Sequence, residues 1–109
     1  MRALPKVELH RHLEGCVRVS TYLELAPAEL KLSSAEAAKD HFCIHTRPVA
    51  DLTVALDKFA HTQRLFSSVE RIERLSFEAV ESCALDGIVV LELRYSPRSL
   101  PVVPQAAEV

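Results

Sequence analysis

The sequence predicts an α/β fold that is built on a parallel sheet. Two segments, residues 6–10 and about 88–95, have the composition of β-strands, and the stretch between them carries several helical patterns. Strands that are separated by helices normally pair in parallel, and both faces of such a sheet are normally covered. The chain has 109 residues, which is enough for one domain at most.

Composition and charge argue against several classes of function. The formal net charge is −2 and no Lys/Arg cluster is present, which speaks against a nucleic-acid partner. No apolar run approaches the roughly 20 residues that a membrane span requires, and charged residues interrupt the N-terminal segment where a signal sequence would lie. Cys16, Cys43 and Cys83 form no C-x-x-C pair, so we expect reduced thiols in a cytoplasmic protein.

The first strand carries a pair of histidines. His10 and His12 are two residues apart, so on an extended strand both side chains project from one face. The same alternation places Glu8 on this face, and Val7 and Leu9 on the other. Two neutral imidazoles side by side suit a divalent metal such as zinc. The alternative is a polar face that simply meets water, but a parallel sheet would enclose it.

Two helical patterns follow this strand. Residues 15–26 have apolar side chains at helical spacing, and Pro27 ends the run. Ser33 can cap a second helix that continues through about Phe42, with Glu36 completing a capping box.

Two further helices precede the second strand. Asp51 can cap the first of them, whose apolar stripe consists of Leu52, Leu56, Phe59 and Gln63. Ser67 begins a second capping box and starts the last helix, which closes at Gly87. The buried side of that last helix is predicted to contain Ile72, Leu75, Ala79, Val80 and Cys83.

The second strand begins with a continuously apolar run, residues 88–91, which is typical of a strand that is covered on both faces. It then alternates and places Glu92 and Arg94 on one face. Together with the two histidines, these side chains would line an enclosed polar interior, and barrel folds place their active sites at the carboxyl ends of such strands. We expect Glu8 to pair with Arg94 there, with Glu92 as a competitor for Arg94, because buried charges need partners.

Two motifs resemble a known family. Residues 5–15, PKVELHRHLEG, closely resemble the opening strand of the adenosine deaminase family, and residues 86–97, DGIVVLELRYSP, resemble its second barrel strand. The helical stretch between them is similar in length and pattern. The resemblance implies a (β/α)8 TIM barrel with one zinc ion, of which residues 1–109 are the N-terminal part of a single domain. It implies that His10 and His12 are two zinc ligands, with two more ligands on later strands.

The family's reaction is the hydrolytic deamination of a 6-aminopurine, adenosine to inosine with release of ammonia. Glu14 stands where adenosine-specific members commonly have an aspartate that meets the ribose, so a deaminase of adenine or another 6-aminopurine is the alternative. This position implies that Glu14 binds substrate; otherwise it caps the helix after Gly15. Leu52, Leu56 and Phe59 are expected to roof a purine pocket, or else to be ordinary core.

The later motifs of the family are not in these 109 residues. No His-Ala-Gly-Glu-like or Asp-Asp-Pro segment is present, and we expect His41, His45 and His61 to be surface or packed histidines. No catalytic residue is therefore expected within this chain. We expect an inactive N-terminal fragment of a zinc-dependent hydrolase that acts on a small-molecule purine; the alternative is a non-catalytic metal-binding or interaction module.

Overall fold

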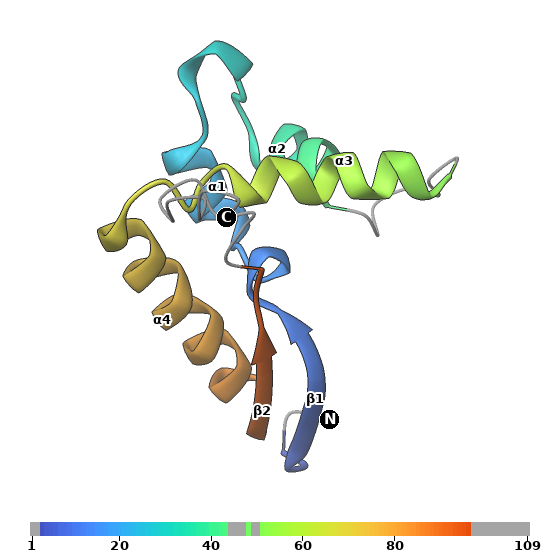
Figure 1. Cartoon of the computed structure of the whole chain (residues 1–109), viewed down its shortest axis with the longest axis vertical. Helices are drawn as coiled ribbons and strands as arrows, with labels where there is room; N and C mark the ends of the chain where they lie inside the picture. The colour runs from blue at the N-terminus through green and yellow to red at the C-terminus, as the bar shows by residue number, and fades with distance from the viewer. Residues whose placement is uncertain (1–2, 44–47, 49–50, 97–109) are drawn as a thin grey trace, which may run out of the picture.

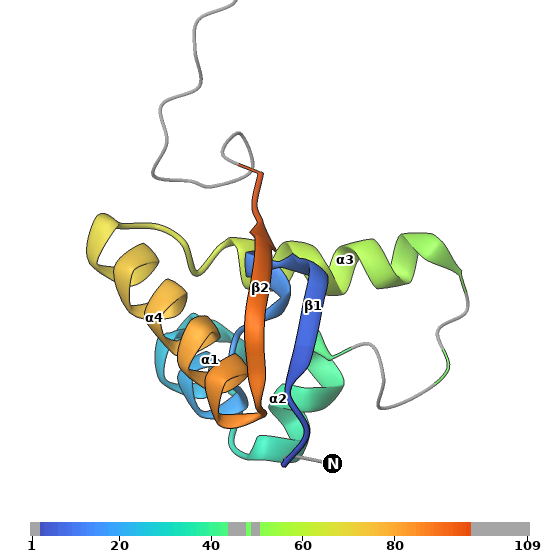
Figure 2. The ribbon, with the colours of Figure 1, turned by 90° about the horizontal axis from the view of Figure 1, so that it is seen from below.

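The computed structural model describes residues 3–43, 48 and 51–96. It confirms the α/β class, with two strands that lie side by side, α4 running beside β2, and α3 crossing near the carboxyl ends of the strands (Figures 1 and 2). In chain order the elements are β1 (Lys6–His12), the 3-10 turn η1 (Leu13–Gly15), α1 (Val19–Leu25), the 3-10 turn η2 (Ala28–Leu30), α2 (Ala35–Phe42), α3 (Leu52–Gln63), α4 (Val69–Leu85) and β2 (Ile88–Arg94).

The two strands pair in parallel, as the sequence predicts. The partners that lie opposite each other include Val7–Val90, Glu8–Leu91, Arg11–Leu93 and His12–Arg94. From Glu8 to Arg11, β1 advances by three residues while β2 advances by two. β1 therefore contains a β-bulge in this stretch, which adds one residue and locally disturbs the ladder.

The bulge changes which side chains of β1 share a face. Residues that lie opposite each other in a sheet point the same way, so Glu8 and Arg11 lie on the face of the two β2 leucines, whereas His12 and Arg94 lie on the other. The prediction that Glu8 shares a face with the histidines is therefore wrong. The predicted Glu8–Arg94 pair is wrong for the same reason: Glu8 Oε2 accepts from Nη2 of Arg11 at 3.3 Å.

Only one face of the sheet is covered by the helices. Leu93 packs on this side against the core, whose buried members are Leu13, Tyr22, Ala38, Phe42, Leu65, Phe66, Leu75 and Ala79. Most of the other face is open in the described part of the chain, so Val7 and Val90 are more than half exposed. The expectation that β2 is covered on both faces is therefore not met by these residues.

The apolar stripe of α4 is mostly as predicted. Leu75, Ala79 and Cys83 are buried, and Ile72 packs partly buried against the core. Val80 was predicted on the same side and is 51% exposed. The reason is geometric, because each residue turns an α-helix by about 100°, which carries Val80 away from the stripe of Ala79.

Side chains and a glycine define the helix ends. Asp51 caps α3 as predicted, by accepting from the backbone N–H three residues on. Ser34 caps α2 and Ser68 caps α4 in the same way, so each cap is the second serine of its pair and not the first. Gly87, with φ of 82°, follows α4 in the left-handed conformation that suits glycine. Within the described ranges, no helix is long and apolar enough to cross a bilayer.

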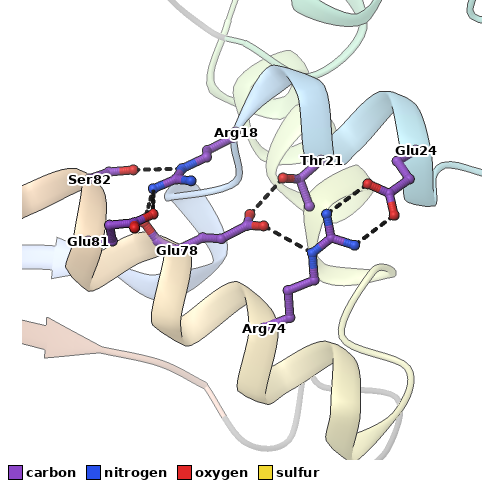
Figure 3. Close-up of polar contacts among 7 residues, drawn as sticks. All are labelled: Arg18, Thr21, Glu24, Arg74, Glu78, Glu81 and Ser82. Carbon is purple, nitrogen blue, oxygen red and sulfur yellow. Dashed lines mark hydrogen bonds and ion pairs between the residues drawn. The ribbon is translucent and has the colours of Figure 1, made fainter.

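The start of α1 is joined to α4 by Arg18 (Figure 3). The helix was predicted over residues 15–26, but Arg18 is in an extended conformation and precedes its first turn. The Arg18 guanidinium donates to Ser82 Oγ at 2.9 Å, to Glu81 Oε2 at 2.6 Å and to the backbone oxygen of Glu78 at 3.1 Å. These contacts fix α1 against the middle and the end of α4.

A second set of polar contacts continues along the same two helices (Figure 3). Glu78 accepts from Thr21 Oγ1 at 2.6 Å and from Arg74 Nε at 3.0 Å. Arg74 also forms a bidentate ion pair with Glu24, with both distances at 2.7 Å. Burial would raise the pKa of Glu78, but the hydrogen bonds from Thr21 and Arg74 outweigh it and the pKa is lowered. The pKa of Glu24 is lowered by its hydrogen bonds from Arg74.

Candidate functional site

His10 and His12 lie together on the open face at the carboxyl end of β1. Their Nε2 atoms are 3.2 Å apart, their ring centroids are 5.2 Å apart, and both residues are exposed. Two nitrogen ligands at about 2.0–2.1 Å from a tetrahedral zinc ion lie about 3.3 Å from each other, so this pair fits two corners of such a site. No group of three or more potential metal ligands occurs among the described residues. The structure thus supplies two donors of the four that a closed site needs.

Phe59 stands beside this pair. Its ring meets that of His12 edge to face, with centroids 6.0 Å apart and 82° between the planes. Phe59 Cε2 also lies 3.3 Å from the position where a Cβ on Gly15 would be, so glycine allows the close approach of α3 to η1. Phe59 therefore lies against His12 and Gly15, while its predicted role in roofing a purine pocket stays a prediction.

Leu52 and Leu56 lie on the first half of α3, which extends beyond the strands in Figures 1 and 2. They are 72% and 59% exposed. The alternative that these two leucines are ordinary core is therefore wrong for this chain. Their role as the roof of a purine pocket stays a prediction, because they lie on the same helix as Phe59 but further from the histidines along it.

Glu14 follows the histidines in η1 and is fully buried. Its Oε1 accepts from the backbone N–H of Ser96 at 2.8 Å, so it joins the carboxyl ends of β1 and β2. Its Oε2 is buried and finds no hydrogen-bond partner among the described residues. Glu14 does not cap the next helix, because α1 begins after Arg18 and has no side-chain cap. The alternative of a helix cap is therefore wrong.

His41 and His61 form a separate pair between α2 and α3. Their rings stack with centroids 4.0 Å apart, as expected for packed histidines. Burial lowers the pKa of both, and the positive charges of Lys58 and Arg64 act in the same direction. His45 lies outside the described residues.

The residues behind the histidines were missed by the reasoning from sequence. Cys16 Sγ donates to the backbone oxygen of His12 at 3.2 Å, and burial raises the pKa of this thiol although Arg11 opposes the shift. The pKa of Glu8 is lowered, first by the N–H of His10 and then by Arg11. The opposite charges of Glu8 and Arg11 could have indicated that these two side chains pair. Residues three apart share a strand face only where a bulge intervenes, however.

A cavity of about 450 Å³ opens next to these residues, among η1, α1, α2 and α3. Its lining is mainly apolar, and neither His10 nor His12 contributes to it. The lining includes Arg11, Gly15, Cys16, Arg18, Phe42 and Phe59. The cavity and the histidine pair thus lie on different sides of η1 and β1, with Phe59 and Gly15 between them.

Comparisons with known proteins agree with the two sequence motifs. The family model described as adenosine deaminase matches residues 5–103. The chain is 40% identical over 100 residues to an adenosine deaminase of Danio rerio, which covers 88% of this chain and 27% of that protein. It is 36% identical over 96 residues to one of Clostridium perfringens, covering 86% and 29%. The chain thus spans less than a third of the length of these relatives. No solved structure matches it.

Proposed function

Because this chain belongs to the adenosine deaminase family, we propose that residues 1–109 are the N-terminal part of a single (β/α)8 barrel domain that deaminates a 6-aminopurine. The proposed reaction is the hydrolysis of adenosine to inosine and ammonia. The parallel pairing of β1 and β2 and the polar side chains at their carboxyl ends support this, because barrels place their active sites there. The open face of the sheet is where the interior of a closed barrel would form.

The observation that carries the proposal is the 3.2 Å separation of the Nε2 atoms of His10 and His12. We assign these two residues as zinc ligands, with the remaining ligands supplied by other parts of the whole protein. Both rings must then present an unprotonated Nε2 and carry their proton on Nδ1. Zinc in such a site makes water nucleophilic near neutral pH, which is the chemistry that hydrolytic deamination needs.

The substrate-binding residues are proposed from their places around the histidines. Phe59 packs edge-on against His12 and supports an apolar wall for a purine ring, which Leu52 and Leu56 would extend along α3. Glu14 has one carboxylate oxygen that no group in the described part of the chain engages, so it can accept a hydrogen bond from a substrate hydroxyl or amine. That oxygen is enclosed at present, so this contact requires Glu14 to turn from its buried position.

The activity is assigned to the whole protein, because the chain spans less than a third of the length of its relatives. These 109 residues hold two of the proposed metal ligands and none of the proposed acid–base groups, so the chain alone should be inactive. A cytoplasmic location is part of the proposal. Cys16 and Cys83 are free thiols in the described part of the chain, as suits a reducing compartment.

Grafting tests the proposal directly. The purified chain, given zinc and adenosine, should produce no inosine. The same chain, grafted in place of the matching segment of a full-length relative, should support deamination, and His12→Ala in the graft should remove it. His61→Asn is the matched control and should keep turnover, because His61 packs on His41 away from the site. Turnover by the isolated chain, or full activity of the His12→Ala graft, would contradict the proposal.

A second substrate is favoured by one observation, the glutamate at position 14. Its side chain is longer than aspartate and is enclosed against Ser96, which leaves less room at the end of the site that would hold a ribose. The graft should therefore be assayed with adenine as well as adenosine. Preference for adenine would make this protein a deaminase of the free base. An inactive graft whose segment folds and binds zinc would favour the non-catalytic metal-binding module.

A further inference from the structure

The backbone of His10 is held by a side chain from the opposite face of the sheet. His10 lies in the bulged stretch of β1, where an extra residue disturbs the ladder. Its backbone N–H donates to Glu8 Oε1 at 3.1 Å. The carboxylate of Glu8, two residues earlier, thus supplies the acceptor that the backbone N–H of His10 needs within the bulge.

The second carboxylate oxygen of Glu8 anchors the first. Glu8 Oε2 accepts from Arg11 Nη2 at 3.3 Å, and both side chains are about one-third exposed. The positive charge of Arg11 in turn opposes the rise that burial produces in the pKa of Cys16, which lines the same cavity as Arg11. Cys16 Sγ donates to the backbone oxygen of His12 at 3.2 Å. The backbones of both histidines are therefore tied to side chains on the covered face.

We propose that Glu8 is a positioning residue for the histidine pair, which sets the approach of the two Nε2 atoms by fixing the His10 backbone in the bulge. Its effect on metal binding rests on the zinc site proposed above, whereas its effect on the two rings does not. Groups that orient metal ligands commonly act on the free ring nitrogen of a histidine. Here the control would act through the main chain, because both Nε2 atoms face each other on the open side.

A simple surface ion pair is the competing explanation, because exposed pairs of this kind contribute little. The chain offers a matched control for it. Lys6 also lies on β1, and its Nζ is 3.0 Å from Oδ2 of Asp86 at the end of α4, with both side chains part-exposed. Among the described residues, the Lys6 side chain pairs with Asp86 and not with a histidine. If Glu8 acts only as a surface charge, removing it should resemble removing Lys6.

The experiment compares the 109-residue chain with Glu8→Met, Glu8→Gln and Lys6→Met, using NMR. Glu8→Met keeps the bulk of the side chain and removes the acceptor, whereas Glu8→Gln keeps an oxygen for the His10 N–H and removes the charge. Two signals are followed: the exchange rate of the His10 amide, and the nuclear Overhauser effect between the Hε1 protons of His10 and His12. The dissociation constant for Zn²⁺ alone is measured on the same samples.

Glu8→Met should speed His10 amide exchange, abolish the ring-to-ring signal and weaken Zn²⁺ binding by roughly 10-fold. Glu8→Gln should largely keep the wild-type amide exchange and ring-to-ring signal, and Lys6→Met should change neither of these signals. Wild-type rings and amide exchange in Glu8→Met would overturn the inference. If Glu8→Met does not fold, the wild-type chain decides the question. Fast exchange of its His10 amide would overturn the inference, and slow exchange would support it. Wild-type chain that binds no Zn²⁺ would refute the proposed metal site, while the ring signal still decides the role of Glu8.

Discussion

His41 of α2 and His61 of α3 stack on each other, with ring centroids 4.0 Å apart and 29° between the ring planes. Both imidazoles are partly enclosed, and Lys58 and Arg64 add positive charge nearby, so the pKa of each is lowered. His41 Nε2 is buried, and no residue that the structure describes forms a hydrogen bond with it. A proton on either ring would therefore be placed against positive charge and away from water, which the folded state opposes.

Stability should therefore decrease when the pH falls from 7.5 to 5.5. The unfolded chain binds protons at the ordinary histidine pKa of about 6.5, whereas the folded chain binds them only at lower pH, so protonation favours unfolding in this window. Glu24 and Glu78, whose pKa values are lowered, lose their stabilising effect only below their ordinary value of 4.5. His41→Phe should flatten the dependence of the unfolding free energy on pH, as measured by urea denaturation. An unchanged slope would refute this.

Lys58→Met should loosen the end of α2. Lys58 Nζ donates to the backbone oxygens of Asp40 and Cys43 at 2.7 and 2.8 Å, which satisfies carbonyl groups at a helix C-terminus with a positive charge. The expected loss is about 0.5–1 kcal/mol, together with faster amide exchange in the last turn of α2. Lys39→Met is the control, because within the described ranges the Lys39 side chain pairs with Glu36 on the surface and not with the end of α2. Equal effects of the two variants would contradict this role of Lys58.

Thr21→Val tests the polar contacts between α1 and α4. Thr21 is buried and donates to Glu78 at 2.6 Å, so valine keeps the shape and removes a hydrogen bond to a charged group. We expect a loss of about 1–2 kcal/mol in unfolding free energy, at the lower end because Glu78 is partly exposed. The pKa of Glu78 should rise towards its ordinary value, which carboxyl ¹³C shifts report. Thr53→Val, at an exposed site on α3, should leave the unfolding free energy and the pKa of Glu78 unchanged.

Gly15→Ala and Phe59→Leu should be coupled. The added Cβ would lie 3.3 Å from Phe59 Cε2, so the ring must shift and carry its contact with His12 along. Gly15→Ala alone should cost about 1 kcal/mol and move the His12 Hε1 resonance. In the Phe59→Leu background the same change should cost less, with a coupling energy of about 0.5–1 kcal/mol from a double-mutant cycle. Additive effects would show that the contact does not constrain the site.

The sequence predicted the features that depend on local patterns. The strands, the parallel pairing and the cap by Asp51 follow from periodicity and from side chains that act within a few residues. Ser33 and Ser34 show the limit of this reasoning, because adjacent serines are chemically equivalent and only the packing of α2 selects the second. The spacing of His10 and His12 was informative because two residues on one face of a strand lie together without any contact from a distant part of the chain.

The misplaced parts of the site depend on distant pairing. An even alternation along β1 placed Glu8 beside the histidines, but its register against β2 introduces a bulge that turns it away. Glu14 was expected to cap a nearby helix or meet substrate; the structure rules out the cap and shows that Glu14 accepts a hydrogen bond from Ser96, which is 82 residues away. Neither relationship has a local signature, because each exists only when the two strands lie side by side.

The contacts of Arg18 and Glu14 also have a consequence for folding order. Their partners, such as Glu81 and Ser96, follow 63 and 82 residues later in the chain. At a synthesis rate of about 5–20 residues per second, the first segment waits for several seconds before these partners are made. Such distant contacts also slow folding, because long loops must close before they form. The histidine pair is thus synthesised several seconds before β2 and Ser96, and its surroundings should be completed only after they are made.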